Sequence, residues 1–388
     1  MTHRIPVFAS MLLAGALAAC GGTYARGTAP VRGVAAAGLP YEILDAHTGR
    51  QVDKAAFWTA IGGARAVCIG EEHPNPHHHW MQLEVVSHLA ALPRPFAVGM
   101  EMVQRPFQGV LDDYAAGRID AAALESRTGW ADRWGYDFAM YQPILAEAVA
   151  HHATLLALNA SKELVKKVSH EGIDKLDAAD RALLPEMKLD DAKHRAWFEA
   201  IMARMGASPH GHRVGHGAGK EMPHDAIHAG VPEGAGGPAD GHGAGKAMPH
   251  DAVHEGVMPH DANHAGVSDG DDDGDEDGDE ADDAPPTAEE LAAQDAAAER
   301  MYSVQVLWDE SMADGAARWL AGDPTRAIAI LAGDGHCHDS AIVGRIKRRG
   351  IASVVSLRPV VDDGEGAVAT VLASPENDYV IVLTPPKQ

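Results

Sequence analysis

The chain has 388 residues, of which 46% are hydrophobic, so it is long enough to bury one large core or two modest ones. Its formal net charge is −24, but residues 268–283 alone hold eleven acidic side chains and no basic one, and the remainder carries −13. Because phosphate recognition requires clustered Lys and Arg, this composition argues against a nucleic-acid-binding protein.

The first twenty residues are typical of an export signal. His3 and Arg4 precede an apolar run over residues 5–18, which is too short to span a bilayer but suits the core of a signal peptide. Leu17-Ala18-Ala19-Cys20 resembles the bacterial lipobox, in which Cys20 is lipidated and becomes the first residue of the mature protein. The alternative is an ordinary secretory signal followed by a chance cysteine. The residues after Cys20 are glycines and not Asp, which resembles default sorting to the outer membrane. We therefore expect a lipid-anchored protein of the cell envelope that faces the periplasm or the cell surface.

Residues 21–38 are rich in Gly and Ala and predict a flexible tether. Over 39–205 and again over 288–388, short apolar strands alternate with helices. This alternation predicts an α/β domain with a mostly parallel sheet flanked by helices. The expected strands cover 66–69, 96–100, 154–158, 327–331, 353–358 and 379–384, and the expected helices cover 80–89, 104–116, 119–127, 140–152, 288–322 and 340–349.

The segment 206–287 interrupts this pattern. It consists mainly of Gly, His, Asp, Ala and Pro, and such a composition buries too little apolar surface to offset the entropy of ordering, so we expect disorder. Residues 215–228 recur at 241–254 with two substitutions, and a partial third copy covers 258–264. The sequence thus predicts one α/β domain, formed by 39–205 and 288–388, with a long His-rich and acidic insert.

The insert holds ten of the 23 histidines, and six of them form pairs four residues apart. On a helical turn, such a pair lies on one face and can hold one ion, and imidazole suits Zn, Ni and Cu. The alternative is a solvated loop with no selected metal role. The predicted metal ligands are His224, His228, His250, His254, His260 and His264.

Four of the expected strands end in polar residues. Glu71, Glu72 and His73 follow the first strand, and Glu101, Asn159 and His336 follow or end three others. Functional groups of open α/β sheets gather at the carboxyl ends of strands, so we expect these side chains to converge. Carboxylates and imidazoles at one edge suit metal binding, acid–base chemistry or ligand recognition.

The segment Gly70-Glu71-Glu72-His73-Pro74-Asn75-Pro76-His77-His78, with Gln82 and Gly99-Met100-Glu101-Met102, resembles the ChaN family of haem-binding lipoproteins in the Tiki superfamily. Further matches are Leu111–Tyr114, Trp134–Pro143, Leu158-Asn159 and Gly333-Asp334-Gly335-His336. Two features depart from the family pattern: the insert, and Asp334, where Asn is usual. The resemblance implies a haem-binding protein of haem or iron acquisition, with an outer-membrane haem receptor as its partner, and it is compatible with a homodimer.

The same resemblance implies where haem binds. Tyrosinate suits ferric haem, and the resemblance favours Tyr141 or Tyr136 without choosing between them; as an alternative, both are core aromatics. His73, His78 and His336 are further expected haem contacts. The expected lining of the site is Glu71, Glu72, Gln82, Glu101 and Asn159.

Two other functions remain open at this point. One is a metal-dependent hydrolase, protease-like or esterase-like, with Glu72 or Glu101 as base and His73 or His336 as ligands, although neither HExxH nor a zinc-type Cys pair is present. The other is a metal scavenger whose core only displays the insert. Cys68 and Cys337 either form a disulfide, which an exported protein tolerates, or are separate buried thiols.

Overall fold

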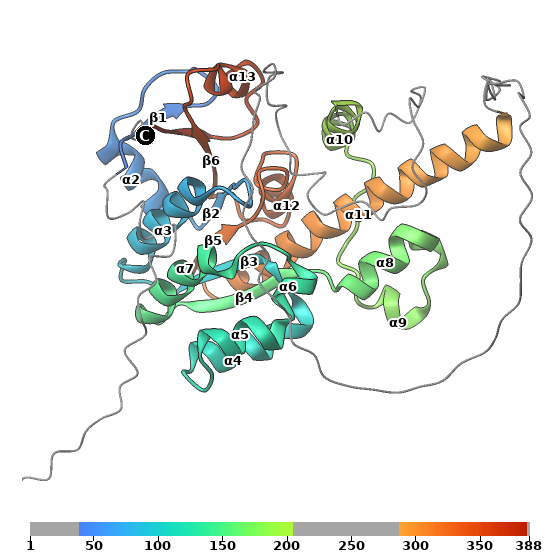
Figure 1. Ribbon diagram of the computed structural model, residues 1–388, viewed down its shortest axis with the longest axis horizontal. Helices are drawn as coiled ribbons and strands as arrows, with labels where there is room; N and C mark the ends of the chain where they lie inside the picture. The colour runs from blue at the N-terminus through green and yellow to red at the C-terminus, as the bar shows by residue number, and fades with distance from the viewer. Residues whose placement is uncertain (1–38, 205–286, 386–388) are drawn as a thin grey trace, which may run out of the picture.

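A computed structural model describes residues 39–204 and 287–385 (Figure 1). It contains a seven-stranded sheet in the order β1-β7-β6-β2-β5-β3-β4, in which β1 and β7 are antiparallel and every other neighbouring pair is parallel. The predicted mostly parallel α/β fold is confirmed. The strands are β1 (Tyr41–Asp45), β2 (Ala66–Ile69), β3 (Phe96–Gln104), β4 (Thr154–Asn159), β5 (Ala327–Leu331), β6 (Val354–Val361) and β7 (Tyr379–Leu383).

The two segments that flank the insert build one sheet. β5 comes after the insert, yet it lies between β2 and β3, which both precede it. Every residue of β2 and β5 is buried, because helices cover both faces of the sheet. Such double burial explains why the two strands are continuous apolar runs without polar alternation.

One face of the sheet packs against α2 (Lys54–Gly63), α3 (Pro76–Ala90) and α7 (Phe138–Ala150), and the other against α8 (Lys162–Glu171), α11 (Ala288–Ala321) and α12 (Ile342–Arg348). α11 begins with a capping box between Thr287 and Glu290, and its buried residues lie between Tyr302 and Leu320. The remaining helices are η1 (Arg105–Phe107), α4 (Gln108–Ala115), α5 (Ala121–Thr128), α6 (Trp130–Arg133), η2 (Ile173–Lys175), α9 (Ala178–Arg181), α10 (Ala192–Arg204) and α13 (Ala367–Ala373).

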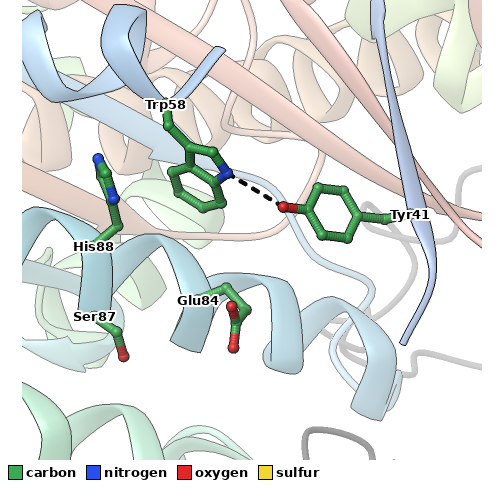
Figure 2. Close-up of a pocket in the computed structure, with 5 residues that line it drawn as sticks. All are labelled: Tyr41, Trp58, Glu84, Ser87 and His88. Atoms are coloured by element: carbon green, nitrogen blue, oxygen red, sulfur yellow. Dashed lines mark hydrogen bonds between the residues drawn. The ribbon is translucent and has the colours of Figure 1, made fainter. Parts of the chain in front are cut away.

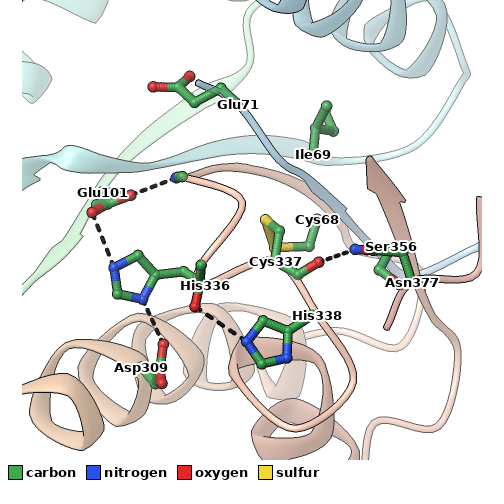
Figure 3. The surroundings of a disulfide bond; sticks show 12 residues. Cys68, Ile69, Glu71, Glu101, Asp309, His336, Cys337, His338, Ser356 and Asn377 are labelled. Atoms are coloured by element: carbon green, nitrogen blue, oxygen red, sulfur yellow. Dashed lines mark hydrogen bonds and ion pairs between the residues drawn. A yellow bond between two sulfur atoms is a disulfide. The ribbon is translucent and has the colours of Figure 1, made fainter. Parts of the chain in front are cut away.

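Cys68 of β2 and Cys337, which follows β5, form a fully buried disulfide (Figure 3). Their Cα atoms lie 5.3 Å apart, although 269 residues separate them in the chain. The first of the two alternatives for these cysteines is therefore the one the structure contains. The crosslink joins the segments before and after the insert directly beneath the carboxyl ends of the central strands.

The predicted signal peptide with Cys20, the tether at 21–38 and, except for Thr287, the insert at 206–287 lie outside the described residues. The predicted metal ligands from His224 to His264 lie there as well. Within the two described ranges, no helix combines the length and the apolar character that a membrane crossing requires.

Candidate functional site

Glu71 lies one residue beyond Gly70, where the chain leaves β2, and it is fully buried. Its Oε1 atom accepts a hydrogen bond from the Tyr141 hydroxyl at 2.6 Å and lies 2.8 Å from Nδ1 of His73. Its Oε2 atom accepts from Nε2 of Gln82 at 2.6 Å and lies 3.4 Å from Nδ1 of His79. Four side chains thus surround one carboxylate, and we call these five residues the Glu71 cluster.

Helix α3 supplies two members of this cluster. Asn75 caps the helix by accepting from the His77 N–H, and Pro76 occupies its first turn, so the sequence fixes the start of α3. This start places His79 and Gln82 one turn apart on the face toward Glu71. Nε2 of His79 lies 2.8 Å from the carbonyl oxygen of His73, which ties the helix to the loop after β2.

Aromatic rings cover the Glu71 cluster on one side. The His73 ring lies 4.6 Å, centroid to centroid, from both the Trp134 ring and the Tyr136 ring. Trp134 Nε1 donates to the Tyr141 hydroxyl at 3.1 Å. Tyr141 has no exposed surface, whereas Tyr136 is half-buried. Of the two predicted tyrosine ligands, Tyr136 is therefore the one at the surface of the cluster.

The groups of the Glu71 cluster favour a negatively charged Glu71 and a positively charged His73. Burial opposes ionisation of Glu71, but His79, His73 and the Tyr141 hydroxyl together lower the pKa of this carboxyl. Burial also opposes charging of His73, yet the hydrogen bond to Glu71 and the charges of Glu71 and Glu101 raise the pKa of the imidazole. Burial and Glu71 raise the pKa of Tyr141 well above its ordinary value, so this hydroxyl keeps its proton.

A second cluster lies under the carboxyl ends of β3 and β5 (Figure 3). Nε2 of His336 lies 3.3 Å from Oε1 of Glu101, and Nδ1 of His336 lies 2.6 Å from Oδ1 of Asp309 on α11. Oδ2 of Asp309 lies 2.9 Å from Nε2 of His194 on α10 and 3.7 Å from NH1 of Arg345 on α12. We call these five buried residues the Asp309 cluster.

This arrangement alternates negative and positive charges away from water. Burial opposes charging of His336, but Glu101 and Asp309 raise the pKa of its imidazole to about 10. Burial would raise the pKa of Asp309, and the charges of Arg345 and His336 lower it instead. His336 is therefore an imidazolium held between two carboxylates near neutral pH. The charge of Glu101 also acts on His73, which couples the two clusters.

Asp334, one of the two departures from the family pattern, is partly buried beside Glu71. Its N–H donates to the carbonyl oxygen of Glu71 at 3.0 Å, and a Cβ atom at Gly70 would lie 2.1 Å from its Oδ1. A side chain at position 70 would therefore displace the Asp334 carboxylate. Burial and the charges of Glu72 and Glu71 raise the pKa of Asp334 to about 6, against the opposing charge of Arg358.

The structure brings together most of the side chains that the sequence predicts. Glu71, His73, Gln82 and Tyr141 share one cluster, and Glu101 and His336 share the other. Two predicted lining residues stand apart. Glu72 is exposed and accepts from Asn75 Nδ2 at 3.0 Å, and Asn159 accepts from the N–H of Ala160.

Asp309, His194 and Arg345 are cluster residues that the sequence does not predict. A signal existed for Asp309, because it interrupts the apolar stripe of a predicted helix, where a charged residue has to be paired. Among the described residues, no group of three or more His, Cys, Asp or Glu side chains has an arrangement suited to a metal ion.

A surface pocket lies away from both clusters, between β1, α2 and α3 (Figure 2). Trp58 Nε1 donates to the Tyr41 hydroxyl at 3.2 Å, and the Trp58 and His88 rings lie 4.6 Å apart. Glu84 and Ser87 complete the lining. None of the predicted site residues takes part in this pocket.

Comparison with known proteins assigns the chain to a family. Residues 57–346 match the family described as haem-binding uptake proteins, Tiki superfamily, ChaN. The fold is similar to that of ChaN of Campylobacter jejuni, solved with cofacially bound haem, with a TM-score of 0.54 and 13% sequence identity over 89% of this chain and 97% of that one. No curated protein matches the sequence. Because the family match covers most of the chain, the protein belongs to the ChaN family of the Tiki superfamily.

Proposed function

We propose that this protein is exported, lipid-anchored through Cys20, and binds ferric haem at the carboxyl edge of its sheet as a step of haem or iron acquisition. Membership of the haem-binding ChaN family supports the ligand. The observation that carries the proposal is the contact of the half-buried Tyr136 with His73, which Glu71 holds from behind. Haem proteins use tyrosinate and imidazole as axial ligands, so the residues present fit this cofactor.

The structure favours Tyr136 over Tyr141 as the axial ligand. The Tyr141 hydroxyl donates to Glu71 inside the core, and its raised pKa opposes the phenolate that ligation requires. The Tyr136 ring lies beside His73, whose raised pKa places a positive charge next to a phenolate. When bound, ferric iron supplies the Lewis acid, and His73 and Trp134 form the adjacent wall of the site.

The test is a ferric haem titration of the full-length protein with Cys20 replaced by Ser. The insert histidines would bind haem loosely, so all ten are replaced by Asn in the background used. These are His210, His212, His216, His224, His228, His242, His250, His254, His260 and His264. A saturable Soret shift is expected. Tyr136→Phe removes the tyrosinate signature and Tyr141→Phe retains it; the reverse result contradicts the choice of Tyr136, and no saturable binding contradicts the function.

Export and lipidation are proposed from the N-terminal sequence, and the buried disulfide supports an oxidising compartment. The proposed location is the outer membrane, with a haem receptor as partner and with a homodimer as the assembly to test. Mass spectrometry of the mature N-terminus tests the anchor, since a lipidated Cys20 is expected as the first residue. A mature chain that begins at another residue contradicts it.

The insert is proposed to bind Zn, Ni or Cu through its three histidine pairs, as the sequence predicts. Equilibrium dialysis compares the wild-type chain with the variant that lacks the ten insert histidines. Uptake is expected in the wild-type chain beyond that of the variant. Equal uptake by both chains rejects the metal hypothesis and leaves a solvated loop.

A metal-dependent hydrolase is the second candidate. The observation in its favour is that Glu71 holds His73 by the Nδ1 atom, as second-sphere carboxylates orient metal-binding imidazoles. Stoichiometric metal in the variant without insert histidines, together with esterase or protease turnover that Glu101→Gln abolishes, would establish this function. A metal-free protein that binds haem rejects it.

A further inference from the structure

Arg358 lies on β6 at the carboxyl edge of the sheet, beside the loop that carries Glu71. The carbonyl oxygen of the preceding Leu357 accepts from the N–H of Gly70 at 2.9 Å, so Arg358 flanks the entrance to that loop. Its side chain is 18% exposed. Its Nε atom makes an ion pair with Oδ2 of Asp334 at 3.7 Å, and within the described residues this Nε atom has no hydrogen-bond partner.

His78, near the start of α3, presents a second donor without a partner. Its Nδ1 atom accepts from the N–H of Glu72 at 2.9 Å, so Nε2 carries the proton of the neutral ring. Within the part of the chain that the structure describes, Nε2 has no hydrogen-bond partner, and the side chain is 1% exposed. A buried donor left in this state is costly, and an acceptor would relieve that cost.

The two donors belong to one neighbourhood. Glu72 binds His78 through its N–H, and the adjacent Glu71 accepts from the N–H of Asp334, which faces Arg358. Burial first, and then nearby positive charges that include Arg358, lower the pKa of His78, in agreement with this proximity. The ends of β2, β5 and β6 and the start of α3 therefore meet around these side chains.

We propose that Arg358 and His78 form a carboxylate-binding subsite next to the Glu71 cluster, which holds a propionate group of haem, and that Asp334 competes with this ligand for Arg358. The inference rests on the proposed haem-binding function. A guanidinium and a neutral imidazole N–H are both donors, so the group they recognise is an acceptor. A carboxylate is the acceptor that haem carries.

The charge around the subsite gives Asp334 its role. Asp334 and Glu376 interact with the charge of Arg358, and Glu72 and Glu71 act in turn on Asp334. Asp334 is the one in an ion pair with it, and an incoming carboxylate meets its repulsion at the same guanidinium. Removing the charge of Asp334 leaves Arg358 available to the ligand carboxylate. Removing Arg358 leaves only the repulsion between Asp334 and that carboxylate. The two substitutions are therefore expected to change haem affinity in opposite directions.

The experiment compares ferric haem with its dimethyl ester, in which both propionates are neutral, in the full-length background without insert histidines. Arg358→Gln is expected to weaken haem binding about tenfold or more and to leave the dimethyl ester unaffected. His78→Phe weakens haem in the same selective way. Asp334→Asn is expected to raise the affinity for haem and to leave the affinity for the ester unchanged. Arg94→Gln is the matched control, since Arg94 is also partly buried with unpartnered guanidinium atoms but precedes β3 at the opposite edge.

Each outcome decides the matter. If Arg358→Gln lowers the affinity for haem and for the ester equally, Arg358 has a structural role and the subsite is overturned. An unchanged haem affinity also overturns the subsite and leaves only ordered water as the partner of these donors. Arg358→Lys guards against misfolding, because it keeps the charge and is expected to retain part of the selectivity. If the parent protein binds neither porphyrin, the proposed haem function itself fails, and the subsite fails with it.

Discussion

The two buried clusters use the same residue types in different ways. In the Glu71 cluster, one carboxylate collects hydrogen bonds from neutral groups, Tyr141 and Gln82, as well as contacts with imidazoles, and aromatic rings cover it. In the Asp309 cluster, two carboxylates, an imidazolium and Arg345 alternate in charge below the sheet edge. Every member of both clusters is buried, but the half-buried Tyr136 ring lies against His73 of the first.

This difference suggests different roles for the two clusters: the first contacts a ligand, and the second stabilises the fold. A cluster that presents a half-buried aromatic ring can contact a ligand through it, so substitution there is expected to change affinity. A cluster of balanced buried charges is sensitive to the loss of any one of them, because the partner is left unpaired away from water. The Asp309 cluster is therefore expected to govern stability first and ligand binding only through His336.

The largest expected effect is that of Asp309→Asn. This substitution leaves His336 and Arg345 without their shared carboxylate, and breaking a buried ion pair costs about 3–5 kcal/mol of unfolding free energy. Urea unfolding measures the loss. Asp295→Asn, on the exposed part of the same helix, is the control and is expected to have an effect close to zero. Similar effects at both positions would contradict the role assigned to Asp309.

The pH dependence of stability also distinguishes the clusters. The folded-state pKa of His336 is about 10, above its unfolded value near 6.5, so its contribution is complete below pH 6.5 and is lost as pH rises through 10. Between pH 7 and 10 the loss is on the order of 3 kcal/mol. The His336→Gln variant is expected to show a urea midpoint that changes much less between pH 7 and 10 than that of the wild-type protein. For Glu71, whose pKa is lowered, the contribution is instead lost at acidic pH. A wild-type midpoint independent of alkaline pH would exclude a buried imidazolium at position 336.

Loss of the disulfide tests how firmly the clusters are held together. Cys68 lies three residues before Glu71, and Cys337 directly follows His336, so the crosslink fixes one cluster relative to the other. Cys68→Ala combined with Cys337→Ala is expected to lower the unfolding free energy by about 2–4 kcal/mol, because the unfolded chain loses a very long closed loop. The wild-type protein in reducing and oxidising buffer is the comparison. An unchanged midpoint would show that the sheet alone holds the two clusters in place.

The sequence predicts the Glu71 cluster more completely than the Asp309 cluster, for a physical reason. Glu71, His73 and Gln82 lie within twelve residues of one another, and strand β2 with the capped helix α3 fixes their directions locally. Asp309 and His194 come from helices on either side of the insert. His194 reaches Asp309 through the packing of α10 against α11, and Asp309 reaches His336 from α11. These residues are far apart in the chain, so no short sequence motif predicts their contacts.

The fold shows the same division. Continuous apolar runs identified six strands, including β2 and β5, because burial on both faces leaves no other pattern. The edge strand β1 was not predicted, and β3 extends to Gln104 instead of ending near Met100. The pairing of β3 with β4 shifts register between Met100 and Gln104. The polar residues in this stretch suggested that the strand had ended, so its continuation beyond the shift was not predicted. The predicted helix over 104–116 is divided into η1 and α4, with Pro106 in η1.

The smallest expected effect compares two buried or partly buried tyrosine hydroxyls. Tyr141→Phe removes a donor 2.6 Å from Glu71, and a hydrogen bond to a buried charged group is worth about 1.5–3 kcal/mol of unfolding free energy. Tyr41→Phe removes a hydroxyl that only accepts from Trp58 at the partly exposed surface pocket (Figure 2), so its expected loss is about 1 kcal/mol or less. Urea unfolding of both variants measures the difference. If Tyr141→Phe costs no more than Tyr41→Phe, the remaining contacts of Glu71 suffice to stabilise its charge, and Tyr141 is then as replaceable as a surface residue.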